Sequence, residues 1–277
     1  EGQGIIAEAE TLGEEPEARN TLQFLRADTV LLDPGEWQFD YGVTYSLFDI
    51  ELPSINSSSL LEHARFRQRE LLTPLEIRYG FTRRLQLFAN APFGWSNVEF
   101  SRSDLDLFEN DGGFGDLTFG GTFLLRQGNH CCSDIVWTNS CTAPTGIDPF
   151  GPNPPGLPQN PSLGNGTWSL ASNLLFIRTY DPLVVFYGFG TRHHFDRQVN
   201  GQNFEQGQEY NYQMGVGFAV NSKVTFSTRF NGAYVTEARL DSQRIRGSIQ
   251  EPMIISMALT IAQCNGLVEP FVDFGVT

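Results

Sequence analysis

Charged side chains that alternate with apolar ones are the residues of this chain most able to do chemistry. They are Asp40, Glu76, Arg78, Arg192, His194, Arg229, Glu269 and Asp273. Each lies on the polar side of a segment whose other side is apolar. An unpaired charge is very costly in a dry core and costs little in a wet lumen. The pattern therefore predicts that these residues line an aqueous interior, where they either set selectivity or pair as structural struts.

Enzymatic chemistry is a weaker interpretation of the same chain. His193 and His194 are adjacent, so on a strand they point to opposite faces and cannot form one site together. No Ser/His/acid trio has an interpretable spacing. The stretch GGFGDLTFGG at 112–121 has no Lys-Ser/Thr and opens a strand, so it is not a phosphate loop. We expect no catalytic residue, no metal site and no cofactor.

The chain has four cysteines, which are Cys131, Cys132, Cys141 and Cys264. An even number fits an oxidising compartment, and four cysteines allow three pairings. Their spacing lacks the CxxC pattern of a zinc site. We expect disulfide formation in preference to free thiols.

The elements that must position these residues are strands. In residues 37–48, WQFDYGVTYSLF, aromatic and apolar side chains take the odd positions and polar or small ones nearly all the even positions. This alternation is typical of a strand with one apolar face. It recurs along the chain, which contains 23 Phe and 28 Gly. Eleven such strands can be recognised.

Short and long connections alternate between these strands. Short links fall near 80–83, 181–182, 221–222 and 265–266, and long polar ones near 49–63, 96–113, 141–165, 196–208 and 236–250. Bacterial outer-membrane barrels have short periplasmic turns and long extracellular loops. We therefore predict an all-β, antiparallel up-and-down transmembrane β-barrel of about 12 strands. Because an even number is expected, a twelfth strand is predicted beyond Thr277.

Composition narrows the functional classes. The net charge of −14 argues against binding to nucleic acid, which needs a basic face. No apolar run approaches the roughly 18 residues of a membrane helix. Residues 1–35 begin with a strongly acidic stretch and are predicted to be a periplasmic segment, acting as a plug or a partner-binding tail. Residues 36–277 are predicted to be the barrel.

Several motifs resemble a known family. They are GFGDLTFGGTFLL at 113–125, APTG at 143–146, LGNGTWSL at 163–170, RTYDPLVVFYGFG at 178–190, GVGFAVNSKVTFS at 215–227, QEP at 250–252 and VEPFVDFGVT at 268–277. They resemble the bacterial outer-membrane family named for the MetA pathway of phenol degradation. The resemblance runs from about residue 21 to the end. It implies a small barrel that moves hydrophobic or aromatic compounds across the outer membrane.

Two functions remain open at this point. The first is a channel for small hydrophobic or aromatic solutes, in a wall about 20–25 Å across. The second is a structural scaffold that binds a neighbouring protein or surface assembly through the acidic N-terminal segment or the 141–165 loop. Both place the chain in the bacterial outer membrane, in contact with its lipid.

Overall fold

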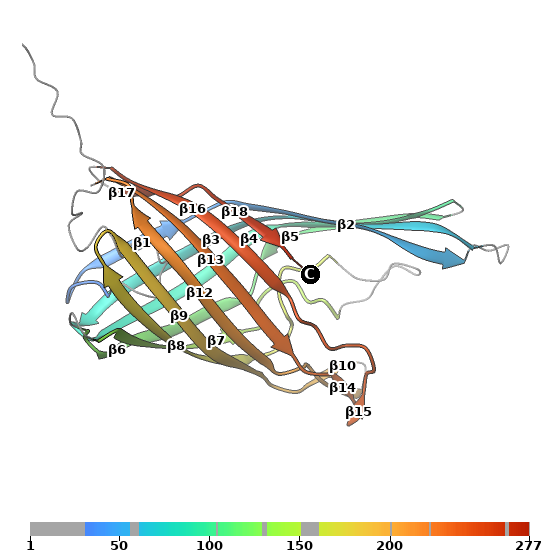
Figure 1. Cartoon of the computed structure of the whole chain (residues 1–277). Helices are drawn as coiled ribbons and strands as arrows, with labels where there is room; N and C mark the ends of the chain where they lie inside the picture. The colour runs from blue at the N-terminus through green and yellow to red at the C-terminus, as the bar shows by residue number, and fades with distance from the viewer. Residues whose placement is uncertain are drawn as a thin grey trace, which may run out of the picture.

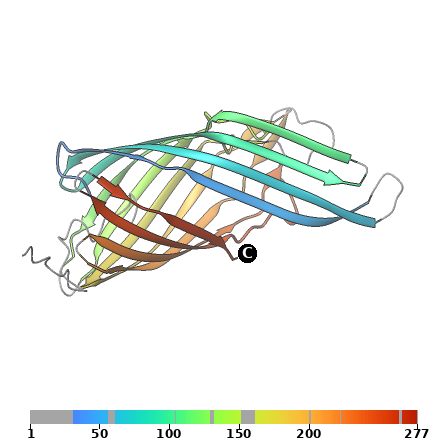
Figure 2. The same ribbon diagram turned by 90° about the horizontal axis from the view of Figure 1, so that it is seen from above.

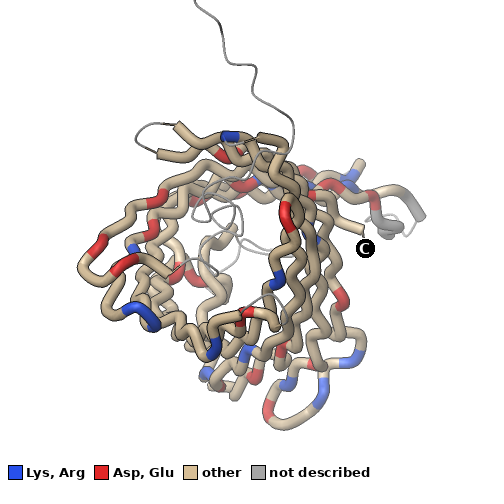
Figure 3. Tube along the Cα trace, turned by 60° about the vertical axis from the view of Figure 1, so that its left-hand side comes forward, with Lys and Arg blue, Asp and Glu red and all other residues tan. Residues whose placement is uncertain are grey.

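The computed structural model describes residues 31–55, 61–103, 105–128, 132–150, 161–199, 201–221, 223–263 and 266–276. In this part of the chain no helix is long and apolar enough to cross a membrane. The main element is an antiparallel sheet of fourteen strands that curls around a central opening (Figure 3). Of the N-terminal segment predicted at residues 1–35 as a plug or a partner-binding tail, residues 1–30 lie outside the described residues.

The strands of the main sheet are β1 (Trp37–Tyr41), β2 (Thr44–Ile55), β3 (Leu61–Thr82), β4 (Leu85–Arg102), β5 (Leu105–Phe114), β6 (Leu117–Arg126), β7 (Asp134–Ala143), β8 (Ser169–Tyr180), β9 (Leu183–His194), β12 (Glu209–Ala219), β13 (Val224–Val235), β16 (Met253–Gln263), β17 (Gly266–Val268) and β18 (Phe271–Gly275). A separate four-stranded sheet consists of β10 (Arg197–Val199), β11 (Gln202–Glu205), β14 (Arg239–Leu240) and β15 (Gln243–Arg244). Figure 1 shows this small sheet at one end of the wall.

Eleven wall positions follow from the pairing of the described strands. The neighbours run in the order β1-β3-β4-β6-β7-β8-β9-β12-β13-β16-β17, while β2 and β18 extend the first and last positions and β5 pairs with β4 next to β6. The eleven recognised strands are therefore confirmed. Because every neighbour is antiparallel, the first and last strands run in the same direction.

The two edges of the wall are not hydrogen bonded to each other among the described strands. A cavity of about 1090 Å³ lies between them, lined by Thr44–Phe48 on one side and Glu269–Val272 on the other. In the view of Figure 2 the blue first strand and the red last strand border this region.

Side-chain alternation gives the wall an outer and an inner face. On β12, Tyr210, Met214 and Val216 are exposed, whereas their sequence neighbours on the other face are glycine or polar. β13 pairs with β12 in uninterrupted register from Val235 to Thr225, so its own outer residues continue the same apolar surface. The prediction that one face of each strand is apolar is therefore confirmed for β12 and β13, and this apolar face is the outer one.

Two segments predicted as long loops are strands instead. The stretch 49–63 contains the end of β2 and the start of β3, and 96–113 contains the end of β4 and most of β5. These strands project beyond the rest of the wall (Figures 1 and 2). Beyond the membrane the outer face of a strand need not be apolar. These strands are therefore polar in composition, and for this reason they were predicted as loops. We call residues 44–55, 61–71, 95–102 and 105–112 the extracellular extension.

The extracellular extension reverses the pattern of the wall. Its outer face carries Arg65, Arg67 and Arg69 on β3, and apolar side chains begin again on that face at Leu71. Its other face carries Phe66 and Val98, which are buried in a cluster with Ile50, Phe100 and Leu107. The apolar face thus changes side at the edge of the membrane band.

Two further segments that were predicted as loops also contain strands. Residues 196–208 contain β10 and β11, and residues 236–250 contain β14 and β15. Together they form the four-stranded sheet, in which β11 pairs with β14 through Phe204 and Leu240. Strands of two to four residues carry too little alternation to be recognised from sequence. In the predicted 141–165 loop, β7 extends to Ala143, and residues 151–160 lie outside the described residues.

Candidate functional site in the barrel lumen

The inner face of β1 and β3 carries an ion-paired cluster. Arg78 is buried, and its Nε lies 3.0 Å from Asp40 Oδ2, to which it donates a hydrogen bond. The same Nε lies 3.0 Å from Glu76 Oε1. Asn90 on β4 donates its side-chain amide to the other Glu76 oxygen at 3.3 Å. One guanidinium is therefore shared by two carboxylates, an arrangement that fixes all three predicted lumen residues in place.

Three more predicted lumen residues lie on β9 and β13. Arg192 Nε is 3.7 Å from Glu209 Oε2, which is an ion pair without a hydrogen bond. His194 is buried at the end of β9, while His193 faces outward and contacts Gln208 through Nδ1 at 2.6 Å. The two histidines therefore point to opposite faces, as predicted. Arg229 is half-buried on β13.

The last strand carries the remaining two candidates. Thr260 on β16 donates its hydroxyl to Glu269 Oε2 at 2.9 Å, and Thr260 is buried. Glu269 lies between β17 and β18, next to Pro270, which has no N–H for the sheet and separates the two short strands. Asp273 on β18 is exposed and lines the cavity between the first and last strands. Asp40, Glu76 and Arg78 thus form one cluster.

An apolar cluster on the inner face was missed by sequence reasoning. It consists of Val136, Leu175, Ile177, Val184 and Phe186, with Leu124 packed against it. The register explains the cluster, since Val136 is paired with Leu175 and Ile177 with Phe186. These residues alternate with outward Leu174, Phe176 and Val185, so both faces are apolar here and period-two analysis could not separate them.

This cluster narrows the lumen on the side of β6–β9. All five core members expose at most 5% of their surface. The ionic cluster lies on β1 and β3, several wall positions away. Since barrel interiors are normally polar, an apolar patch of this size on the inner face is unusual. The lumen thus combines a charged side and an apolar side.

The segment before β1 contacts the lumen wall. The backbone N–H of Leu32 donates to Gln86 Oε1 at 3.0 Å, and Gln86 is on the inner face of β4 with 1% exposure. Gly80 allows the close approach, because a Cβ there would lie 2.2 Å from the Asp33 carbonyl oxygen. Residues 32–33 therefore enter β1 from the lumen side.

Asp116 is a second residue that sequence reasoning missed. It is buried at the break between β5 and β6, where its Oδ1 accepts from Gly146 N–H at 3.0 Å and its Oδ2 from Asn165 N–H at 2.6 Å. Thr145 supports the same junction by accepting from Leu117 N–H at 2.9 Å. Asp116 thus ties both ends of the loop between β7 and β8 to the wall. The GFGD, APTG and LGNG motifs mark these contacts.

Two of the predicted disulfide cysteines can be described. Cys132 and Cys141 are free thiols. Cys132 lies before the start of β7 and Cys141 lies near its end, and the seven residue steps from Asp134 to Cys141 alone span about 23 Å of strand. Of the three pairings left open, the one that joins Cys132 to Cys141 is not formed in this structure, because disulfide Cα atoms lie within about 7 Å of each other. Cys131 and Cys264 lie outside the described residues.

Charges on the extracellular extension form a connected network. Arg65 donates to both oxygens of Asp49, at 2.8 and 2.6 Å, and Arg67 donates to Asp49 Oδ2 at 3.0 Å. The hydrogen bond from Arg65 is the main reason that the pKa of Asp49 is lowered from 3.8 to about 2. Arg67 is also 3.6 Å from Glu99 on β4. Within the described ranges, no three His, Cys, Asp or Glu side chains form a possible metal site.

Comparison with known proteins identifies the family. A family model described as "Putative MetA-pathway of phenol degradation" matches residues 76–248, which is more than half of the 277 residues. The chain belongs to this family. The resemblance inferred from the motifs is therefore confirmed.

A solved structure has a similar fold. The chain resembles the crystal structure of the COG4313 outer membrane channel from Pseudomonas putida F1, with a TM-score of 0.63 and 16% sequence identity over 88% of this chain and 89% of that chain. At this identity the likeness concerns the fold. It confirms the predicted all-β, antiparallel barrel architecture. The family and fold together place this member in the bacterial outer membrane.

Proposed function

We propose that this family member is an outer-membrane channel for small apolar or aromatic solutes. The observation that carries the proposal is the buried apolar cluster of Val136, Leu175, Ile177, Val184 and Phe186 on the inner face of β7–β9. A general porin keeps a polar, hydrated interior. The members of the cluster expose at most 5% of their surface, so they keep polar groups out of this part of the lumen wall, which favours an apolar solute over a charged one. The similar fold of an outer membrane channel supports the same proposal.

The charged residues of the lumen have two roles in this proposal, which are support of the wall and exclusion of polar solutes. Arg78, held by Asp40 and Glu76, stiffens the opposite part of the wall, and Arg192 with Glu209 is more loosely paired. We assign the Arg78 cluster mainly to structural support, since its guanidinium is shared by two carboxylates. Arg192, His194, Arg229, Glu269 and Asp273 are proposed to tune which polar solutes are excluded.

Single-channel recording in planar bilayers tests the channel proposal. We expect a small, steady conductance from the full chain, because the apolar cluster narrows the water-filled path. Removal of residues 1–30 tests the proposal that the N-terminal segment obstructs the lumen, since the contact between Leu32 and Gln86 starts on the lumen side. A larger current after truncation supports such a plug. No current from either protein, with folding verified by heat-modifiable gel migration, contradicts the channel.

A scaffold is the second candidate, and the extracellular extension favours it. The extension projects well beyond the wall (Figure 1). Its Arg65 and Arg67 form ion pairs with Asp49. A surface partner could bind there without using the lumen. Cells that carry a chain lacking the extension should then lose the partner and keep solute uptake.

A further inference from the structure

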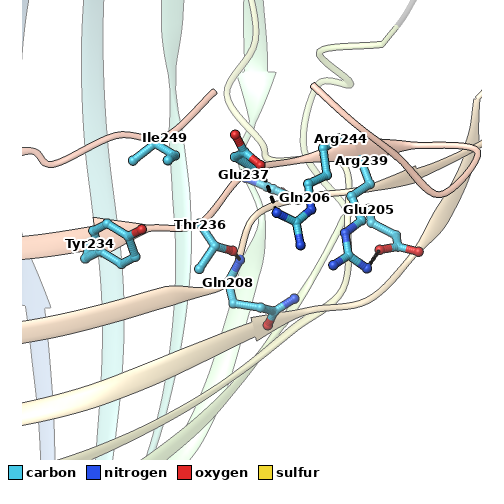
Figure 4. Close-up of a pocket in the computed structure, with 9 residues that line it drawn as sticks. All are labelled: Glu205, Gln206, Gln208, Tyr234, Thr236, Glu237, Arg239, Arg244 and Ile249. Carbon is cyan, nitrogen blue, oxygen red and sulfur yellow. Dashed lines mark hydrogen bonds and ion pairs between the residues drawn. The ribbon is translucent and has the colours of Figure 1, made fainter. Parts of the chain in front are cut away.

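A polar cavity of about 540 Å³ lies at the extracellular ends of β12 and β13 (Figure 4). Its lining combines charged, polar and apolar side chains from β13, from the residues next to the ends of β12 and β13, and from the small four-stranded sheet. They are Glu205, Gln206, Gln208, Tyr234, Thr236, Glu237, Arg239, Arg244 and Ile249. The volume lies within the range of about 300–1,000 Å³ that is usual for sites of small molecules. The cavity is separate from the charged and apolar clusters of the lumen.

Strand alternation places this cavity on the outer face of the wall. Tyr234 is exposed on β13 and is the direct cross-strand partner of exposed Tyr210 on β12, so both belong to the lipid-facing side. Thr236 and Gln208 are each two residues further along the same face. The backbone N–H of Thr236 donates to the Gln208 carbonyl at 2.9 Å, which shows that the strand pairing continues to this level.

The same strand sets the depth of the cavity relative to the membrane. Phe226 and Tyr234 are both exposed on the outer face, eight residues apart on β13. At about 3.3 Å per residue and a tilt of about 40°, they are separated by about 20 Å along the membrane normal. The apolar band of such barrels is about 25 Å tall. The cavity begins just beyond Tyr234, and therefore at the level of the lipid head groups of the outer leaflet.

Two neighbouring arginines of the cavity each form a long ion pair with one carboxylate. Arg239 and Arg244 are direct cross-strand partners on β14 and β15. Like charges in directly opposed positions of a sheet destabilise it. Each has a carboxylate nearby, but Arg239 Nη1 is 3.6 Å from Glu205 and Arg244 Nη1 is 3.8 Å from Glu237. Both distances are too long for hydrogen bonds.

The backbone around the arginines is held firmly. Ala238 N–H donates to Ser248 Oγ at 2.9 Å, and Ile245 N–H donates to the Ala238 carbonyl at 2.9 Å. Gln208 N–H donates to Thr236 Oγ1 at 2.9 Å. The backbone that carries the two arginines is therefore ordered, while their side chains are 46% and 70% exposed and can reach a ligand. An ordered backbone loses less entropy than a flexible one when a ligand binds.

We propose that this cavity binds a phosphate group of an outer-leaflet glycolipid, the class to which lipopolysaccharide belongs. A phosphate that lies between Arg239 and Arg244 would accept charge-assisted hydrogen bonds from both, which Glu205 and Glu237 do not do at 3.6 and 3.8 Å. Tyr234 and Ile249 would contact the sugar and the first acyl carbons, since an amphipathic ring suits this interface. A solute on its way through the channel is a weaker candidate, because the cavity faces the membrane and not the lumen.

Native mass spectrometry of the full chain in detergent tests this proposal, with diphosphoryl lipid A as the probe. We expect the double variant Arg239→Ala/Arg244→Ala to lower lipid A affinity by about tenfold or more, since hydrogen bonds to charged groups contribute this much. Glu237→Gln should raise the affinity, because it removes a charge that repels phosphate. Arg246→Ala is the matched control, since Arg246 is exposed on the same turn and does not line the cavity.

Two further probes distinguish the source of the phosphate. Monophosphoryl lipid A should also bind, because the cavity is proposed to hold one phosphate, and inorganic phosphate at millimolar concentration should not displace either lipid. Equal affinity of the double variant and the Arg246→Ala control, with both folded by heat-modifiable migration, would overturn the proposal. Complete displacement by inorganic phosphate would also overturn it, because the site would then recognise a free anion and not a lipid.

Discussion

Arg78 Nε donates to Asp40 Oδ2 at 3.0 Å across the inner face of β1 and β3, and the same guanidinium contacts Glu76. The Arg78 side chain is 10% exposed and that of Asp40 is 39% exposed, so the pair is only partly shielded from lumen water. Removing the cation would leave two neighbouring carboxylates without their shared partner. The cluster therefore holds the first strand against β3 near the start of the wall.

Arg78→Ala should lower the free energy of unfolding by about 2 kcal/mol, because charge-assisted hydrogen bonds are lost and two carboxylates then repel each other. Urea-induced unfolding in lipid vesicles, followed by tryptophan fluorescence, measures this change. Arg192→Ala is the matched comparison, since its nearest carboxylate in Glu209 is 3.7 Å away and more loosely paired. Equal losses for the two variants would contradict the proposed role of the Arg78 cluster.

Phe186→Ala should increase the single-channel conductance, because it removes a large side chain from the apolar cluster that narrows the lumen. The variant should also be less stable, by about 3 kcal/mol, as is usual for a truncated buried phenylalanine. Phe189→Ala on the same strand is the control, since Phe189 is exposed on the outer face. An unchanged conductance in both variants would show that the cluster does not restrict the path.

Val216→Arg should cost about 2–4 kcal/mol of stability if Val216 lies near the middle of the membrane, because a charge on the lipid face is poorly solvated. Gln213→Arg, on the lumen face of the same strand, should cost much less. The measurement is the unfolding free energy of both variants in the same vesicles. Equal costs would mean that the inner and outer faces of β12 are wrongly assigned.

Sequence alternation predicted the membrane part of the wall well, because lipid requires one apolar face over the whole height of each strand. The register of Tyr210, Met214 and Val216 on β12 is an example. The same reasoning failed at 49–63 and 96–113, where Arg65, Arg67 and Arg69 occupy the outer face. Side chains still alternate there, but the charged residues lie on the outer face and the apolar residues on the inner face.

The candidate site could be predicted only in part. Asp40, Glu76 and Arg78 were recognised because each interrupts an apolar strand with a charge. Their sharing of one guanidinium depends on strand register, which single-strand patterns do not contain. The contacts of Asp116 with Gly146 and Asn165 join segments 30 and 49 residues apart, so no local pattern could have indicated them.

Acid should loosen the extracellular extension through Asp49. Its folded pKa of about 2 lies below the ordinary value of 3.8, so its contribution to stability is fully present above the ordinary value and is lost as the pH falls toward 2. Hydrogen exchange of β2 and β3 between pH 5 and pH 2 measures this loosening. Asp49→Asn should exchange faster at pH 5 and show a smaller change on acidification. Identical pH profiles for the two proteins would argue against this network.

The central claim is that an apolar solute crosses the outer membrane through this barrel. The most direct test is the initial uptake of a radiolabelled one-ring aromatic compound and of its carboxylate analogue, in cells with and without the protein. The account predicts faster uptake of the uncharged compound when the protein is present, and a clearly smaller gain for the carboxylate. Uptake of the uncharged compound at the same rate with and without correctly folded protein would contradict the claim.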